Sequence, residues 1–221
     1  MLTEAQVADA AWRLTVDALE ADLARGETPT LPLPLVGITL LPPWWWLILW
    51  AGKRIENRAP SVAGRLRGWR GLIALTSSKP PASEWPIAIM TALEIKASGI
   101  GSPWAGPKPW VESMAKERSG CVVGVAELLG VQDNDRAPPD PWAVAGQRGF
   151  VLGRVIEVEP VPCSGGRGVF RFGACGGCGK PGAVENKGEP LVCRTCKATT
   201  PFEALGRPNL KVRSVQPRRP A

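Results

Sequence analysis

The 221-residue sequence contains no histidine and no tyrosine. Without histidine the chain cannot carry a Ser-His-Asp triad, a Cys-His catalytic pair or a His-ligated metal ion. Charged residues are modest at 21%, whereas hydrophobic residues reach 44%, so the chain can build a core and global disorder is not expected. Glycine (25) and proline (23) are abundant, which predicts short strands, many turns and long loops.

Acidic residues are scarce in the C-terminal quarter. Residues 1–162 hold 16 Lys and Arg against 17 Asp and Glu, whereas residues 163–221 hold 11 against 3. The formal net charge of +7 therefore comes wholly from the C-terminal quarter. Such a concentration of positive charge predicts contact with a polyanion, most often nucleic acid, with a merely solubilising tail as the alternative.

Residues 31–51 lack charge over nearly the length of a membrane span. Prolines 32, 34, 42 and 43, together with Gly37, interrupt any long helix there. We therefore expect no membrane span. No secretory signal is visible at the N-terminus, which favours a cytoplasmic protein.

The stretch from residue 35 to residue 58 organises the chain. Trp44–Ala51 predicts a short buried helix that ends at Gly52, and Lys53–Arg58 begins the next extended segment. An uncharged run that leads directly into a dense charged cluster indicates a core element that presents a site.

The other elements predict an α+β fold. A helical stripe of apolar residues precedes Gly26, which fits a helix end. Pro60–Arg70 predicts a basic loop and Glu84–Ala97 a helix. Short strands are expected at Leu31–Leu41, Gly71–Thr76, Gly120–Val131, Gly149–Glu159 and Gly168–Phe172. This mixture favours a small mixed β-barrel with peripheral helices over a parallel α/β sheet.

The segments PPWWWLILWAGKRIENR, WRGLIALTSSK, GCVVGVAELLGV and GFVLGRVIEVEPVPC follow one another in the sequence. Their order resembles the ASCH domain of the PUA-like β-barrel superfamily, over roughly residues 32–172. The family pattern is a Pro-Trp turn, a short apolar helix and Gly-x-Lys-x-x-Glu-x-Arg; here Gly52 and Lys53 are adjacent, and the spacing from Lys53 to Glu56 and Arg58 is kept. The family's Ile-His-Ala-Ser-Lys is replaced by Leu-Thr-Ser-Ser-Lys, so any role for that histidine is absent.

The resemblance implies a cleft for a nucleobase or nucleotide, but it does not decide between binding and catalysis. Some small ASCH proteins are amidohydrolases acting on acylated cytidine, and some have been described as ribonucleases. The amidohydrolases use a lysine, a hydroxyl residue and a glutamate on a comparable strand. Lys53 and Glu127 match two of these positions, and Glu56 falls where the hydroxyl residue would be.

The candidate cleft residues have chemistry that suits either role. Lys53 could hold a phosphate or activate a nucleophile, and Glu56 could accept a hydrogen bond from an exocyclic amine or act as a general base. The two converge only if Lys53 lies in the turn after the helix. Arg58 could pair with Glu56 or a phosphate, and Glu127 interrupts an apolar strand, where an ionisable group needs a partner or a wet cleft. The alternative is that these residues form ion pairs that close the barrel.

Aromatic side chains could stack on bases. Candidates are Trp45, Trp69, Trp104, Trp110 and Trp142. Trp69 and Trp104 are favoured because they lie in predicted loops, whereas Trp44, Trp46 and Trp50 are expected in the core. Ser77 is a further candidate ligand contact.

Two C-x-x-C pairs, Cys175–Cys178 and Cys193–Cys196, are separated by 14 residues. This spacing predicts a four-cysteine zinc ribbon, with Gly179 relaxing the first turn and Pro181–Pro190 forming a hairpin. One zinc ion with four thiolates has no open position, so its role would be structural. Two disulfides or a redox motif are the alternatives.

The sequence thus predicts four regions: a helical arm (1–30), an ASCH/PUA-like barrel (31–172), a zinc ribbon (173–206) and a disordered basic tail (207–221). We expect a nucleic-acid-binding protein, for RNA rather than DNA, that reads a base in the cleft. Ribbon residues Lys180, Arg194 and Lys197 would contact the backbone. The alternatives are a metal-independent nucleotide hydrolase using Lys53, Glu56 and Glu127, and a protein-interaction adaptor.

Overall fold

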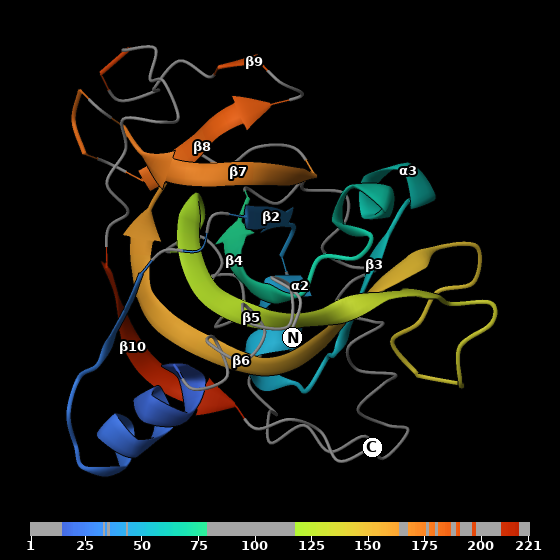
Figure 1. Ribbon diagram of the computed structural model, residues 1–221, viewed down its shortest axis with the longest axis horizontal. Coiled ribbons are helices and arrows are strands. Elements are labelled where there is room, and N and C mark those ends of the chain that lie inside the picture. The colour runs from blue at the N-terminus through green and yellow to red at the C-terminus, as the bar shows by residue number, and fades with distance from the viewer. Residues whose placement is uncertain are drawn as a thin grey trace, which may run out of the picture.

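The computed structural model describes residues 15–32, 34, 36–42, 44–78, 118–163, 168–175, 177–179, 181–186, 189–190, 196–197 and 209–216. Within these residues the chain forms an α+β fold in which a curled, half-barrel sheet wraps around a short helix (Figure 1). The predicted fold class is therefore confirmed at this level. None of the described helices is long and apolar enough to cross a membrane.

The strands are β1 (Thr30–Pro32), β2 (Val36–Leu40), β3 (Ile55–Arg58), β4 (Gly71–Ser77), β5 (Cys121–Asp133), β6 (Arg148–Pro162), β7 (Val169–Ala174), β8 (Pro181–Asn186), β9 (Glu189–Pro190) and β10 (Asn209–Gln216). The helices are α2 (Trp44–Trp50), α3 (Pro60–Ala63), the 3-10 turn η1 (Gly64–Leu66) and a helix over residues 15–24.

The strands lie in the order β1-β10-β6-β5-β4-β2-β7-β8-β9, and β3 pairs with the far end of β6. β2 and β4 are parallel, whereas the other described pairs are antiparallel. The long strands β5 and β6 shift register at three points along their pairing, which bends both of them. Repeated bulges explain how the sheet curls around α2.

Helix α2 fills the concave side of the sheet. Its residues from Trp45 to Leu49 are buried, and Gly52 ends it with φ +71°, as the sequence predicted. The backbone at Gly124 of β5 passes so close that an added Cβ would lie 2.7 Å from a Leu49 methyl carbon. So short a helix is stable because of this packing rather than its intrinsic propensity.

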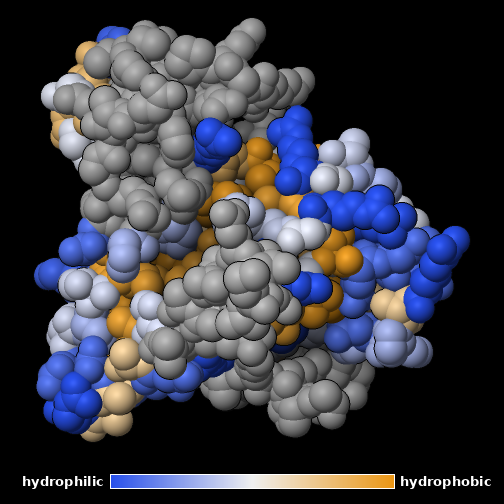
Figure 2. Space-filling model, viewed as in Figure 1, coloured by the Kyte–Doolittle hydropathy of each residue, from blue (hydrophilic) through white to orange (hydrophobic). Residues whose placement is uncertain are grey.

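The helix over residues 15–24 covers the opposite face. Its Val16 and Leu19 are buried together with residues of β6 and β10. Gly26, with φ +79°, follows its end, as predicted. Figure 2 shows hydrophobic residues in the middle of one face of the molecule and hydrophilic residues around its rim.

The predicted disordered tail is wrong for residues 209–216. Leu210 and Val212 alternate with exposed Lys211 and Arg213, a period-two pattern that lets β10 pair with both β1 and β6. The predicted loop over residues 60–70 also begins as a helix, because Pro60 occupies the first turn of α3.

The segment that carries the two C-x-x-C pairs, residues 173–206, is here called the cysteine module, and it is continuous with the half-barrel. β7 pairs with β2 on one side and with β8 on the other, so the predicted boundary at residue 172 falls inside a strand. The module is inserted between β7 and β10, since β10 returns to the half-barrel sheet. The predicted hairpin over Pro181–Pro190 is confirmed as β8 and β9.

Candidate ligand-binding cavity and metal-binding cysteines

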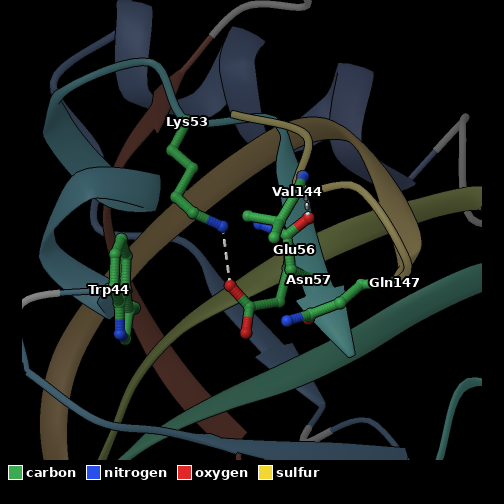
Figure 3. A pocket seen from close by; sticks show the side chains of 6 residues that line it. All are labelled: Trp44, Lys53, Glu56, Asn57, Val144 and Gln147. Atoms are coloured by element: carbon green, nitrogen blue, oxygen red, sulfur yellow. Dashed lines mark hydrogen bonds and ion pairs between the residues drawn. The ribbon is translucent and has the colours of Figure 1, made fainter. Parts of the chain in front are cut away.

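A cavity of about 250 Å³ opens beside Trp44, the first residue of α2, and the turn that follows this helix (Figure 3). Helix α2, the turn after it, β3 and the loop between β5 and β6 all contribute to its wall. Its lining residues are Trp44, Lys53, Glu56, Asn57, Val144 and Gln147. Figure 3 shows Lys53 pointing toward Glu56 across the cavity, with Trp44 on the side of α2.

Lys53, Glu56 and Arg58 form a chain of ion pairs, here called the buried triad. The Lys53 Nζ lies 2.7 Å from Glu56 Oε2, and Arg58 Nη2 lies 3.0 Å from Glu56 Oε1. Lys53 also donates to the Ile55 carbonyl, and Arg58 donates to the Thr39 carbonyl at 2.9 Å. Lys53 lies in the turn between α2 and β3, so the condition for its convergence with Glu56 is met.

Burial dominates the electrostatics of Lys53. The residue is 1% exposed, and its Nζ lies 5.7 Å from the centre of the Trp44 ring. Desolvation lowers the pKa of Lys53, while Glu56 acts in the opposite direction. Arg58 adds to the lowering and Asp140 opposes it. With all three groups ionised, the buried triad carries one net positive charge.

The wall opposite Trp44 is held in place by Asn57. Its Nδ2 donates to the Trp142 carbonyl at 2.7 Å, and its Oδ1 accepts from Asn134 Nδ2 at 2.8 Å and from the Val144 amide at 3.0 Å. Asn57 is thus committed to fixing the loop. The Gln147 side chain, in contrast, makes no hydrogen bond to any residue that the structure describes, so its donors and acceptor are available to a ligand.

Four of the six lining residues are not predicted from the sequence: Trp44, Asn57, Val144 and Gln147. Trp44 was expected in the core, yet it is only partly buried because it begins α2. The loop residues carried no signal, since a polar segment with prolines does not reveal which strand it folds against. Only Asn57, next to Glu56 in the charged cluster, could have been suspected.

Glu127 lies elsewhere. It is fully buried on β5, and its Oε2 accepts a hydrogen bond from the Arg154 backbone amide at 2.6 Å. The carboxylate occupies the space above Gly153, where an added Cβ would lie 1.9 Å from Oε2. Glu127 is absent from the cavity lining and from the charges that act on Lys53. Of the three predicted catalytic residues, the structure brings Lys53 and Glu56 together but not Glu127.

Some of the other residues predicted to contact a ligand are buried, whereas others are exposed. Ser77 is buried, and its hydroxyl donates to the Arg118 carbonyl and accepts from the Cys121 amide at 3.3 Å, which ties β4 to β5. Trp45 and Trp142 are also buried, so neither ring can stack on a base. Trp69 is 39% exposed. Trp104, Trp110, Lys180, Cys193 and Arg194 lie outside the described residues.

Three cysteine thiols come together at the end of the cysteine module. The sulfur atoms of Cys175, Cys178 and Cys196 all lie within 4.8 Å of one another, and those of Cys175 and Cys196 are 3.3 Å apart. Tetrahedral thiolates at the usual Zn–S length are about 3.8 Å apart, so these donors fit a metal ion. Soft sulfur ligands favour zinc among the common ions.

The two C-x-x-C turns share a backbone feature. Gly179 follows the first pair with φ +70°, and its amide donates to the Cys175 carbonyl at 2.7 Å. Lys197 follows the second pair with φ +64°. A residue with left-handed backbone thus directly follows each pair, although only the first is a glycine.

No protein-family model matches this chain, and no curated protein matches it. The likeness to ASCH domains therefore stays a prediction.

Proposed function

We propose that this chain is a nucleic-acid-binding protein, for RNA in preference to DNA, built on an ASCH-like member of the PUA-like folds. The cavity takes one nucleobase, and the basic cysteine module contacts the phosphate backbone. The observation that carries the proposal is the buried triad at a cavity of single-base size. Cavities for drug-sized ligands begin near 300 Å³, so one of about 250 Å³ suits a smaller heterocycle.

The cavity offers the three kinds of contact that a base requires. Each Glu56 oxygen accepts one hydrogen bond within the triad and has a second lone pair for an exocyclic amine or ring N–H. Gln147 can donate and accept at once, as an amide edge of a base does. The Trp44 ring supplies an apolar wall. The triad's net positive charge favours a ligand with a nearby phosphate.

The cysteine module supports the second half of the proposal. We assign Cys193 as the fourth ligand, beside Cys175, Cys178 and Cys196, and zinc as a structural ion. Lys197 is exposed next to this site, which suits a phosphate contact. Elemental analysis of the purified protein should find one zinc ion per chain. A folded protein free of metal would overturn this part.

One observation favours a hydrolase as the second candidate. Burial lowers the pKa of Lys53, which increases the fraction of neutral, nucleophilic amine. Against it, Glu127 does not reach the cavity. Turnover of acylated cytidine that Lys53→Met abolishes, in a variant that stays folded, would establish catalysis. Binding without turnover supports the first proposal.

The experiment for base binding compares Gln147, in the loop before β6, with Gln132, near the end of β5. Nucleosides and mononucleotides are titrated into the zinc-loaded protein by calorimetry. Gln147→Ala should weaken binding about two- to tenfold, because it removes a hydrogen bond to the ligand and none to the part of the fold that the structure describes. Gln132→Ala is the control, since Gln132 bonds Asn134 at 3.2 Å outside the cavity. Equal losses in both variants would indicate loosening of the loop rather than lost recognition.

A further inference from the structure

The segment after β3 presents three exposed arginines and an exposed tryptophan: Arg65, Arg67, Trp69 and Arg70. We call them the arginine–tryptophan loop. Residues 59–71 contain no aspartate or glutamate. Among the described residues, Trp69 and Val144 are the only large hydrophobic side chains that are exposed to solvent.

The loop's positive charge is not neutralised within the described part of the fold. None of its three guanidinium groups forms an ion pair or hydrogen bond there. In contrast, Arg118 and Arg154 bond carboxylates at Glu157 and Asp17. The fold thus leaves three neighbouring arginines available to an external anion.

The loop is anchored rather than loose. Leu66 is buried in the same core cluster as the residues of α2, and the Trp69 amide donates to the Leu66 carbonyl at 3.0 Å. Gly68, with φ +84°, makes the turn between them. Arg70 lies over the backbone of β5, where a Cβ added at Gly130 would be 2.7 Å from its Nη1. An indole ring held out of the core by a fixed turn is presented to solvent at low entropic cost.

We propose that the arginine–tryptophan loop is a binding site for single-stranded nucleic acid, separate from the cavity. The guanidinium groups contact successive phosphates, and the Trp69 ring stacks on an unpaired base. A duplex keeps its bases stacked inside and cannot use the ring in this way. The inference rests on the proposed function in assuming a nucleic-acid partner, but none of its residues lines the cavity.

The observations favour a nucleic acid over a lipid surface. Membrane-surface binding scales with buried apolar area, and this loop offers one ring, because Leu66 is buried and Val62 half-buried. The charge pattern fits both partners, so anionic vesicles belong in the test as a competing outcome.

The test measures fluorescence anisotropy of labelled oligouridylate, oligodeoxyuridylate and a duplex, each of about ten nucleotides. The zinc-loaded full chain should prefer single strands, and the two single-strand arms show whether the sugar matters. Trp69→Ala should weaken single-strand binding by between about fivefold and a hundredfold, while Trp69→Phe keeps most of it. Arg67→Gln should weaken binding more than Arg25→Gln, because Arg25 is already paired with Asp22 and Glu27.

The salt dependence gives an independent readout. Replacing all three loop arginines with glutamine should lower the slope of log K against log salt by about 2, since each phosphate contact on a single strand contributes about 0.7. Unchanged single-strand affinity in Trp69→Ala, or an unchanged slope in the triple variant, would overturn the inference. Binding to anionic phosphatidylserine vesicles that depends on Trp69, without such dependence for oligonucleotides, would overturn it in favour of a membrane.

The two proposals fail separately. If Gln147→Ala weakens nucleoside binding but the loop variants leave the affinity for oligonucleotides unchanged, only the loop inference is wrong. If oligonucleotides depend on Trp69 and no nucleoside binds, the cavity proposal is wrong and the loop inference stands. An absence of oligonucleotide binding at low salt overturns the loop inference as well.

Discussion

Replacing Glu56 with glutamine removes the carboxylate that joins Lys53 to Arg58 and keeps the size of the side chain. The Lys53 and Glu56 side chains are 2% and 8% exposed, so the variant leaves an ammonium group buried without its counter-charge. Breaking a buried pair from one side typically costs 3–5 kcal/mol, and we expect about 3 kcal/mol here because Lys53 keeps its bond to the Ile55 carbonyl. For a chain of this length that loss lowers Tm by roughly 6–12 °C.

Lys53→Met should cost less than Glu56→Gln. In that variant Glu56 keeps its ion pair with Arg58, whereas Glu56→Gln deprives both cations of their shared partner. Glu159→Gln is the matched control, since its pair with Lys211 spans 3.7 Å between side chains that are 45% and 62% exposed. Such surface pairs contribute about 0–1 kcal/mol.

Urea denaturation of the zinc-loaded protein measures all three variants. The expected order of destabilisation is Glu56→Gln, then Lys53→Met, then Glu159→Gln. If Glu56→Gln loses no more than Glu159→Gln, the triad is not the desolvated network described above. In that case the cavity would lack the fixed charges on which base recognition depends.

Three further predictions concern pH, packing and backbone strain. The pKa of Lys53 in the folded protein lies below its ordinary value of 10.5, so at pH values between these two pKa values the unfolded chain binds more protons than the folded one. The free energy of unfolding should therefore rise with pH over this range, and it should rise less in Lys53→Met. Gly153→Ala should destabilise the protein by about 1–3 kcal/mol in thermal melts, and markedly less when Glu127→Ala vacates the contested space. Lys197→Gly should stabilise the zinc-bound protein by up to about 1 kcal/mol in urea denaturation, because glycine adopts the left-handed backbone at this position without the strain that a side chain causes. Gly179→Ala should destabilise the protein, because it places a side chain on the left-handed backbone after the first pair.

Much of the fold follows from local patterns in the sequence. The predicted helix over Trp44–Ala51, its end at Gly52 and the strands around Val125 and Ile156 all agree with the structure. Apolar runs bounded by glycine determine such elements locally. β10 was missed because basic residues and prolines at 207–221 mask the short alternation of Leu210 and Val212.

Only the wall of the cavity formed by Lys53 and Glu56 could be predicted from the sequence. Lys53 and Glu56 are three residues apart, so a single turn brings them together. Gln147 lies about ninety residues away along the chain and reaches the cavity because β3 pairs with β6 and Asn57 fixes the loop before it. For Glu127 the prediction of a cleft residue is not supported. Its carboxylate is buried within β5 and accepts a hydrogen bond from the Arg154 backbone amide.

The central claim, that the cavity binds one base, is tested most directly by NMR titration of nucleosides into isotope-labelled, zinc-loaded protein. We expect the signals of the Gln147 side-chain amide and the Trp44 indole to shift together along one saturating curve, whereas the signal of the Trp69 indole stays unchanged. Saturable binding that moves Trp69 and leaves Gln147 and Trp44 unchanged, or no saturable binding of any nucleoside, would contradict it.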